Sequence, residues 1–307
     1  MTKEGSSKQI PRKVVIAAIF AAVGTGLVVG QVLVPPEPID FAAAEKRVFS
    51  QNGEDGVLEK IFERIEPTQK FAVEFGSGDG VTFSNVRNLF VNHGWGGLLI
   101  EGDEDRVEKS AEAYADTPRV TSLHAWVWPG NIELLFEENG VPKDLDLLVI
   151  DIDSNDWYVW RAIRDFRPKV VQVEFNAAFA PPTKAVVDYH PMTYWDGSDY
   201  FGASIQSFYD LGKKKGYELV YCESQGMNLF FVDEKYFDRF GIDDNSPLKL
   251  YRPPSQNQGF GRGPGGRGEP MWDQFTLVDP KTGEKSMPFN GPLTWDNLEV
   301  NKKFVER

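Results

Sequence analysis

The chain has very few of the residues that build disulfides and metal clusters. Its 307 residues include one cysteine, Cys222, and three histidines, His93, His124 and His190. A lone cysteine excludes an intramolecular disulfide framework and cannot form a cysteine zinc site by itself. So few histidines also argue against a histidine-rich metal cluster. A chain of this length can bury an ample hydrophobic core, so its fold does not need such cross-links.

Basic residues are also in the minority. Lysine and arginine number 33 against 46 aspartates and glutamates, which gives a formal net charge of −13 at pH 7. A broad phosphate-binding face requires clustered cations, so this balance argues against nucleic acid as a partner. A Gly/Pro/Arg-rich stretch at 253–270 contains only Arg262 and Arg267, too few to change that conclusion.

One long run near the N-terminus lacks charge altogether. Residues Val14 to Val34 contain no charged side chain, and as a helix they would span roughly 31 Å, enough for the core of a bilayer. Basic residues precede the run and acidic residues follow it: Lys8, Arg12, Lys13, Glu37 and Asp40. This pattern predicts a single-pass signal anchor with residues 1–13 in the cytosol and the body lumenal or extracytoplasmic. The alternative is a cleaved signal peptide, whose apolar region is usually shorter, about 7–15 residues.

Small residues recur along one face of this predicted helix. Ala18, Ala22, Gly26 and Gly30 lie four residues apart, a spacing that can pair membrane helices and so indicates a homodimer through the anchor. We further expect a linker at 35–47, one catalytic domain at 48–233 and a C-terminal extension at 234–307 with its flexible segment at 253–270.

A glycine-rich loop follows the first apolar strand expected in the domain. Phe71 to Gly80 reads FAVEFGSGDG, which predicts a strand over 71–75 and a tight turn with glycines at Gly76, Gly78 and Gly80. Glycines let the backbone turn sharply and approach a ligand where a Cβ would collide. A helix expected over 85–92 would place its N–H groups near the loop. A plain tight turn is the simpler alternative.

A second apolar run also ends in an acid. Gly97 to Asp103 reads GLLIEGD, and Glu101 closes the expected strand at 98–101. In doubly wound sheets such an acid binds ribose hydroxyls. The loop and its acid resemble motif I of S-adenosylmethionine-dependent methyltransferases. A nicotinamide enzyme is the alternative, but its fingerprint is G-x-G-x-x-G, whereas this chain has G-x-G-x-G.

Strand and helix patterns alternate along the rest of the domain. This order predicts right-handed crossovers and a parallel sheet. The last two apolar runs, at 217–222 and 228–233, are so close that they predict an antiparallel hairpin. We therefore expect an α/β, Rossmann-like, seven-stranded sheet that is mostly parallel and closes with a hairpin. The other expected strands are 120–123, 145–153 and 169–175, and the other expected helices are 57–65, 104–115, 132–139, 156–166 and 204–215.

An ordered set of segments resembles the FkbM-like methyltransferases, a family of mostly O-methyltransferases that use S-adenosyl-L-methionine. The segments, which lie between Phe49 and Asp233, are SQNGEDG, FAVEFGSGDG, GWGGLLIEGD, LLVIDIDSND, VVQVEFN, SDYFGAS, GYELV and NLFFV. The resemblance implies that a donor loop is formed by Glu74, Gly76, Gly78, Asp79 and Gly80. It also implies that Glu101 binds the donor ribose, that Asp151 borders the donor, and that Ala125 and Trp126 form the adenine pocket. Trp126 could instead belong to the core.

Four polar residues come after two strands expected to be neighbours. Asp151 and Asp153 follow one strand, and Glu174 and Asn176 close the other. Residues two apart on a strand project to the same face, so we expect an oxygen-rich cluster. It could orient an acceptor hydroxyl, with Asp153 and Glu174 as catalytic residues, or Asp153, Glu174 and Asn176 could bind Mg²⁺. In the simpler alternative, Asp151 or Asp153 caps the helix that begins at Asp156.

A long insertion between the fifth strand and the next helix carries a histidine among aromatic residues. His190 could remove a hydroxyl proton near neutral pH, because an unperturbed imidazole has a pKa of about 6.5. Tyr194, Trp195 and Tyr200 could stack on a sugar or ring acceptor. The histidine could also be incidental.

Two functions remain in competition at this point. The first is a membrane-anchored S-adenosylmethionine-dependent O-methyltransferase that acts on a small molecule, sugar or glycan. The second is a non-catalytic, membrane-tethered module that keeps the fold. The acid cluster favours catalysis, because a scaffold has no need to gather such groups.

Overall fold

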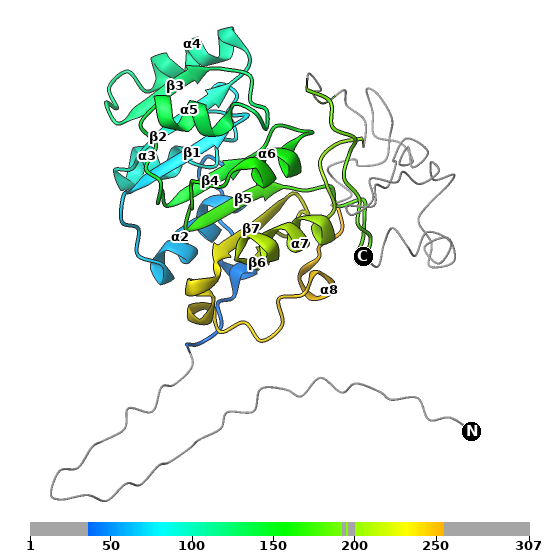
Figure 1. Cartoon of the computed structure of the whole chain (residues 1–307). Coiled ribbons are helices and arrows are strands. Elements are labelled where there is room, and N and C mark those ends of the chain that lie inside the picture. Colours follow the sequence, from blue (N-terminus) through cyan, green and yellow to red (C-terminus); the bar gives the residue numbers. More distant parts are fainter. Residues whose placement is uncertain (1–35, 192–194, 196–199, 255–307) are drawn as a thin grey trace, which may run out of the picture. The chain divides into compact units, whose positions relative to one another are not determined.

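The computed structural model describes residues 36–191, 195 and 200–254 and contains one seven-stranded sheet (Figure 1). Its strands lie in the order β3-β2-β1-β4-β5-β7-β6. All pairs from β3 to β5 are parallel, whereas β7 runs antiparallel to both β5 and β6. The predicted mixed sheet with its closing hairpin is confirmed. The strands are β1 (Phe71–Phe75), β2 (Gly96–Glu101), β3 (Val120–His124), β4 (Leu147–Ile150), β5 (Val170–Glu174), β6 (Tyr217–Cys222) and β7 (Asn228–Asp233).

Helices cover both faces of the sheet and create two hydrophobic cores. On one face, α5, α6 and α7 pack against the sheet through large side chains such as Phe136, Trp160 and Phe208. On the other face, α2 and α3 do so through Ile61 and Phe90. The helices are α2 (Glu54–Arg64), α3 (Arg87–His93), α4 (Glu104–Ala113), α5 (Ile132–Glu138), α6 (Asp156–Ala162) and α7 (Ile205–Lys215). Strands buried from both sides explain the continuous apolar runs in the sequence.

The strand order reverses between β1 and β4, and that reversal fixes where a ligand can bind. From β1 the chain steps outward to β2 and β3, then returns to the other side of β1 to form β4 and β5. The last residue of β1, Phe75, pairs with Ile100 on one side and with Ile150 on the other. Loops that leave such a switch point in opposite directions open a crevice at the carboxyl edge.

Three short elements were not predicted from the sequence. They are α1 (Phe41–Ala44), the 3₁₀ helix η1 (Glu234–Phe240) and α8 (Pro247–Leu250). The ring of Phe41 stacks on Tyr221 with a centroid separation of 5.1 Å and on Phe240 with 6.2 Å. These contacts bring α1 and η1 together against the β6–β7 hairpin and extend the packed core beyond both predicted ends of the domain.

Two helix boundaries differ from expectation for identifiable reasons. Helix α3 begins at Arg87 and not at Asn85, because the Asn85 N–H donates to the Glu74 carboxylate and stays in the loop. Helix α6 ends at Ala162, four residues before the predicted end, where Ile163 adopts an extended backbone.

Several predictions concern residues outside the described part of the chain. These are the signal anchor at 14–34 with its small-residue face, Tyr194, and all of the C-terminal extension after 254. Among the described residues, none of the helices has the length and apolar character needed to cross a bilayer.

Candidate active site

A cavity of about 510 Å³ opens at the carboxyl edge of the sheet. Six strands contribute to its walls through their ends or the loops that follow them: β3, β2, β1, β4, β5 and β7. The residues that line it include Gln51, Glu74, Gly76, Gly78, Phe83, Asn85, Glu101, Gly102, Arg106, Ala125, Trp126, Asp151, Asp153, Asn155, Glu174, Trp195, Met227 and Asn228. Most of the residues predicted as a site are therefore brought together.

The three glycines of the loop after β1, predicted to bind the donor, have different surroundings. Gly76 has a φ of +74°, and a Cβ placed there would lie 1.5 Å from the Asp151 carbonyl oxygen. Only glycine allows the ends of β1 and β4 to pass this closely. Gly78 has a φ of +55° and nothing within 4 Å of its Cβ position, so its open side belongs to the cavity. At Gly80, a Cβ would meet the Ser110 hydroxyl at 2.4 Å, which makes this glycine a packing requirement.

The Glu101 carboxylate is oriented by backbone N–H groups. Its Oε2 accepts from Gly78 N–H at 2.8 Å, and its Oε1 accepts from Gly102 at 2.8 Å and from Asp103 at 3.0 Å. A carboxylate offers about four lone-pair sites, so these three bonds leave about one site free to accept from a hydroxyl in the cavity. Glu101 thus joins the loop after β1 to the end of β2.

Glu74 orders residues 84–85, which follow the glycine loop, through hydrogen bonds. Its carboxylate accepts from the Ser84 hydroxyl at 2.7 Å and from Asn85 N–H at 2.8 Å. Burial raises the pKa of Glu74 to about 7, although these hydrogen bonds oppose the rise. The Glu74 side chain therefore fixes the backbone of residues 84–85 next to the glycine loop.

Asp79 stabilises the loop from outside the cavity lining. Its carboxylate accepts from the N–H groups of Val81 and Thr82 and from the Thr82 hydroxyl. Burial tends to raise the pKa of Asp79, but these hydrogen bonds outweigh it and leave the pKa lowered. Asp79 is placed to shape the turn; its ligand-binding role stays a prediction.

The expected adenine wall stands beside Glu101. Ala125 and Trp126 both line the cavity. The indole packs over Gly102, where a Cβ would lie 2.7 Å from a ring carbon, and its Nε1 donates to the Pro191 carbonyl at 2.9 Å. Trp126 is 38 % exposed, so it forms a wall of the cavity and is not part of either core.

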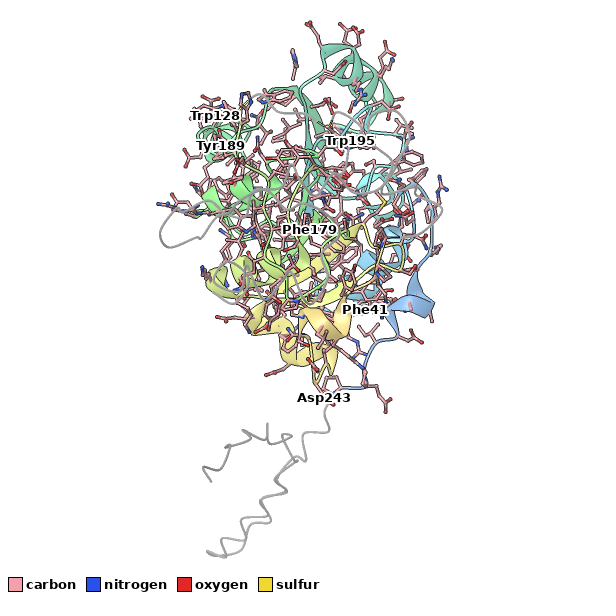
Figure 2. All side chains as sticks on the ribbon, turned by 90° about the vertical axis from the view of Figure 1, so that its right-hand side faces the viewer. Phe41, Trp128, Phe179, Tyr189, Trp195 and Asp243 are labelled. Atoms are coloured by element: carbon pink, nitrogen blue, oxygen red, sulfur yellow. The ribbon has the colours of Figure 1, made fainter. Side chains whose placement is uncertain are left out.

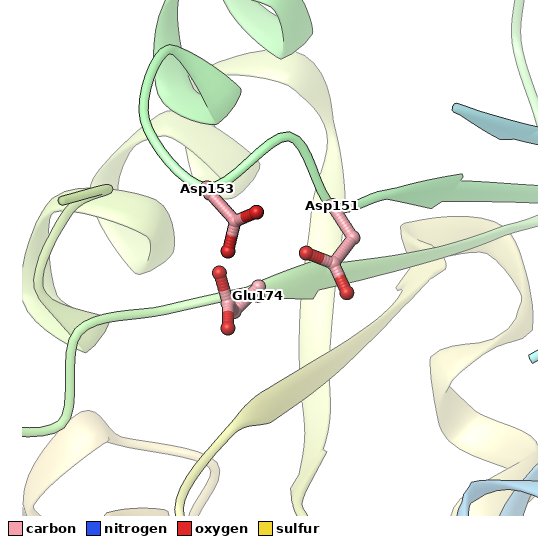
Figure 3. A group of neighbouring side chains, drawn as sticks. All are labelled: Asp151, Asp153 and Glu174. Carbon is pink, nitrogen blue, oxygen red and sulfur yellow. The ribbon is translucent and has the colours of Figure 1, made fainter. Parts of the chain in front are cut away.

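Three carboxylates meet where the ends of β4 and β5 approach each other (Figure 3). One oxygen from each of Asp151, Asp153 and Glu174 lies within 4.8 Å of the other two. Burial and the neighbouring Asp153 raise the pKa of Asp151 well above its usual range. Burial and Glu101 raise the pKa of Asp153, while Arg106 works in the opposite direction. The cluster therefore favours a bound proton or cation.

Asp156 holds the loop that carries this cluster. Its carboxylate accepts from Ile152 N–H at 2.8 Å and from Ser154 N–H at 2.9 Å, on either side of Asp153, whose φ is +60°. The simpler alternative, in which Asp151 or Asp153 caps the helix, does not apply: α6 has Asn155 at its N-cap and no side-chain cap bond. Burial raises the pKa of Asp156 to about 7.

Two predicted residues are not brought to the cluster. The Asn176 side chain donates to the Phe201 carbonyl at 3.1 Å and accepts from Ala178 N–H at 3.0 Å, so its amide orders the loop after β5. Neither Asn176 nor His190 is among the residues that line the cavity. The His190 carbonyl accepts from Asn155 Nδ2 at 2.8 Å, which ties its backbone to the site. A further carboxylate, Asp151, joins Asp153 and Glu174 in the cluster. Metal binding by Asn176 stays a prediction.

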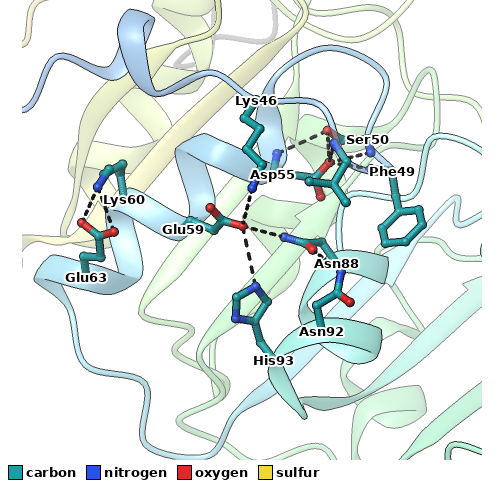
Figure 4. A network of polar contacts seen from close by, with 11 residues as sticks. Lys46, Phe49, Ser50, Asp55, Glu59, Lys60, Glu63, Asn88, Asn92 and His93 are labelled. Carbon is teal, nitrogen blue, oxygen red and sulfur yellow. Dashed lines mark hydrogen bonds and ion pairs between the residues drawn. The ribbon is translucent and has the colours of Figure 1, made fainter.

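A segment expected to be a simple polar turn forms part of the cavity wall. Asp55 Oδ2 accepts from the N–H groups of Val48, Phe49 and Ser50 and from the Ser50 hydroxyl, each within 2.8 Å (Figure 4). This arrangement presents Gln51 to the cavity. The only local signal was an acid-rich turn before an amphipathic helix, which gives no hint of a contact with the distant loop at 83.

Phe83, Asn155 and Asn228 also line the cavity and were missed. The Asn228 Nδ2 donates to Glu54 Oε1 at 2.9 Å, and Asn228 pairs in register with Glu174 across β5 and β7. Asn155 and Asn228 lie within segments recognised in the sequence, LLVIDIDSND and NLFFV, but nothing in those segments indicates that their side chains face a cavity.

Comparison with known proteins finds neither a matching family model nor a matching curated protein. Several solved structures are similar at low identity. The N-terminal domain of EvdMO1 with SAH bound is 13% identical and has a TM-score of 0.40 over 60% of this chain and 82% of that chain. A S-adenosylmethionine-dependent methyltransferase from Clostridium acetobutylicum ATCC 824 is 8% identical, with 0.37 over 58% and 89%. The glycopeptide N-methyltransferase MtfA with SAH is 12% identical, with 0.37 over 63% and 95%. Similarities at this level do not determine the activity of the chain.

Proposed function

We propose that this protein is an S-adenosylmethionine-dependent O-methyltransferase that methylates a hydroxyl of a small molecule, sugar or glycan. One observation carries the proposal. Gly78, with its open side toward the cavity, lies against a Glu101 carboxylate that its own N–H helps to orient. A backbone that can be approached closely, beside an acid at the end of the next strand, suits a ligand with a ribose.

The residues around the cavity fit S-adenosylmethionine as a group. Glu101 would accept from a ribose hydroxyl, and Ala125 and Trp126 would flank the base. Gly76, Gly78 and Glu74 would border the amino-acid end. When bound, the group supplies an electrophilic methyl carbon attached to a positively charged sulfur. The anionic lining favours a ligand of that charge.

The carboxylate cluster would handle the acceptor hydroxyl. Asp153 and Glu174 can accept a hydrogen bond from it, and positioning of the reacting oxygen supplies most of the rate in such a transfer. The raised pKa of Asp153 makes it a stronger proton acceptor than an exposed aspartate.

A second version places Mg²⁺ in the same cluster. Asp151, Asp153 and Glu174 offer only oxygen ligands, which a hard cation prefers. Turnover that EDTA abolishes and added Mg²⁺ restores, with unchanged donor affinity, supports the cation. Turnover that is insensitive to EDTA assigns the cluster to direct hydrogen bonding.

We also propose FkbM-like family membership and a membrane anchor at 14–34, both on the sequence pattern. The flanking charges would place the body lumenal or extracytoplasmic, whereas the methyl donor is made in the cytosol. Protease protection of the C-terminus in sealed vesicles distinguishes the two orientations. The rival function, a non-catalytic tethered module, predicts donor binding without turnover.

The decisive test is calorimetric titration of the full chain with S-adenosylmethionine. We expect saturable binding that Glu101→Ala weakens strongly, because the ribose hydrogen bond is lost. Glu108→Ala, on the exposed side of α4, is the matched control and should leave the affinity unchanged. An absence of binding by the unmutated chain refutes both the enzyme and the tethered module.

A further inference from the structure

Phe83 has an unusual backbone and an exposed ring in the cavity. Its φ is +61°, a left-handed conformation that bulky residues rarely adopt. Its side chain is 47 % exposed and lines the cavity. Among the described residues, only Lys70 and Asp153 share a positive φ without being glycine, and Asp153 is at the acid cluster. Conformations of this kind persist at functional sites when the surroundings enforce them.

The surroundings of Phe83 fix its backbone on both sides. Asp79 holds the N–H groups of the two preceding residues, and Glu74 holds Ser84 and Asn85 immediately after it. Ser50 forms an isolated parallel bridge with Phe83, and the Arg47 guanidinium lies 5.5 Å from the ring centroid. The ring gains little burial from this arrangement, so the fold itself does not explain why an aromatic residue is held there.

The strand order divides the cavity into two halves. Glu101 and Trp126 stand at the β2 and β3 ends, whereas Glu174 and Asn228 stand at β5 and β7. Four strand spacings separate β2 from β7, which amounts to roughly 19 Å. The first half contains the proposed donor site. The second half, with the acid cluster, is left for the acceptor.

Phe83 is connected to the acceptor half through the N-terminal segment. Ser50 pairs with Phe83, Gln51 lines the cavity, and Asn52 Nδ2 reaches Met227 Sδ at 3.5 Å just before β7. Phe83, Gln51 and Met227 thus all line the cavity, and the segment 50–52 links Phe83 to the residue before β7.

The charge of the lining restricts what can bind in this half. Three of the lining acids, Asp151, Asp153 and Glu174, form the cluster in this half, and the other two, Glu74 and Glu101, lie on the donor side. Among the described lining residues the one cation is Arg106. A phosphate or carboxylate on the acceptor would meet like charges that are only partly screened in a half-buried site. Hydroxyl groups, in contrast, would find acceptors for their protons.

We infer that the acceptor half binds an uncharged, hydroxyl-bearing ring of the carbohydrate type, with Phe83 as a specificity-determining residue. The inference rests on the proposed function and narrows its substrate class. The flat apolar face of such a ring packs against Phe83, and its hydroxyl edge points to Asp153 and Glu174. Acceptors that carry phosphate or carboxylate are rejected.

The test compares neutral and anionic sugars that share the same ring, using the full chain. The probes are methyl hexosides, the corresponding hexose 6-phosphates and the corresponding hexuronic acids, each assayed for binding by ligand-observed NMR and for formation of S-adenosylhomocysteine. We expect neutral hexosides to bind and to be methylated, and the anionic members to be at least about tenfold weaker. Equal or stronger binding of the anionic members overturns the inference, as does donor binding without binding of any neutral hexoside.

Phe83→Gly tests the role of the ring without straining the fold. Glycine accepts a φ of +61° freely, so the unfolding midpoint should stay the same or rise. The acceptor KM should increase about tenfold with the loss of the aromatic contact, while the donor Kd stays within about twofold. Phe83→Tyr, which keeps the aromatic ring, should leave the acceptor KM near that of the unmutated chain. Trp128→Ala is the control: its indole is 43 % exposed, lies apart from Trp195 (Figure 2) and does not line the cavity.

The outcomes separate this inference from the proposed function. Loss of donor binding by the unmutated chain defeats the proposed function. A weaker donor Kd in Phe83→Gly with an unchanged acceptor KM assigns the ring to the donor and overturns the inference alone. A lowered unfolding midpoint with an unchanged KM makes Phe83 a structural residue and also overturns it.

Discussion

Two glycines share a left-handed φ and open space at the Cβ position, but only one of them lines the cavity. Gly78 has a φ of +55° and Gly94 has a φ of +68°, and neither has an atom within 4 Å of its Cβ position. Gly78 lines the cavity, whereas Gly94 ends α3 as its C-cap, away from the cavity. Alanine at either position therefore adds the same strain, but only Gly78→Ala places a methyl group where the donor is proposed to lie.

The two substitutions should cost the same stability. A left-handed conformation costs an L-residue roughly 1–2 kcal/mol, and the reduced freedom of the unfolded chain returns about 0.4–1 kcal/mol. The net loss is about 1 kcal/mol, which lowers the unfolding midpoint by roughly 2–4 °C in a domain of this size. In the cavity, overpacking costs about 1–3 kcal/mol, so Gly78→Ala should weaken donor binding by about tenfold to a hundredfold.

The assay pairs thermal unfolding with calorimetric titration of S-adenosylmethionine. We expect similar midpoints for both variants, an unchanged Kd for Gly94→Ala and a clearly raised Kd for Gly78→Ala. Unchanged donor affinity in a folded Gly78→Ala protein would refute the assignment of this loop to the donor. Equal loss of affinity in both variants would show that strain, and not the position of the methyl group, is responsible.

Three further predictions concern Gly76, the acid cluster and the buried Glu223. Gly76→Ala should destabilise the fold by about 3 kcal/mol, because its Cβ would lie 1.5 Å from the Asp151 carbonyl oxygen, and chemical denaturation measures this loss. Asp153→Asn and Glu174→Gln should each lower turnover on the order of 10²-fold while the donor Kd stays constant; normal turnover at saturating donor would place these residues outside the reaction. Burial raises the pKa of Glu223 from its ordinary value of 4.5 to about 7. The folded state therefore holds this proton more tightly, and its stabilising contribution, about 3 kcal/mol, is lost as the pH rises from about 4.5 through 7. Glu223→Gln should remove the share of Glu223 from the pH slope of the unfolding free energy measured between pH 4.5 and 8, while Glu74 and Asp156, whose pKa values burial also raises to about 7, keep the rest. An unaltered slope would contradict the assigned pKa.

Much of the sheet could be predicted because its strands are bounded by strong local signals. The limits of β1 and of both hairpin strands, β6 and β7, match the prediction, since each is an apolar run with glycine or charge at its ends. The glycine turn after β1 was equally predictable, because the close approach of Gly76 to Asp151 and the Gly78–Glu101 hydrogen bond depend on residues at that spacing.

The remaining parts of the site depend on contacts between distant segments. Nothing near Phe83 in the sequence indicates that Ser50 will pair with it. The prediction for Asn176 places its side chain on the same face as that of Glu174, whereas β5 ends at Glu174 and the Asn176 amide contacts Phe201 and Ala178 in the following loops. Asp156 was read as the start of a helix, although its carboxylate also holds the loop of the cluster.

The central claim is that the carboxyl edge of β1 and β2 binds the methyl donor, and hydrogen exchange of the full chain with and without S-adenosylmethionine tests it directly. We expect slower exchange of backbone amides at 76–80, 101–103 and 125–126, with no change at Gly94. No protection at these amides under saturating donor, or protection confined to the opposite edge of the sheet around Asp146 and Lys169, would contradict the account.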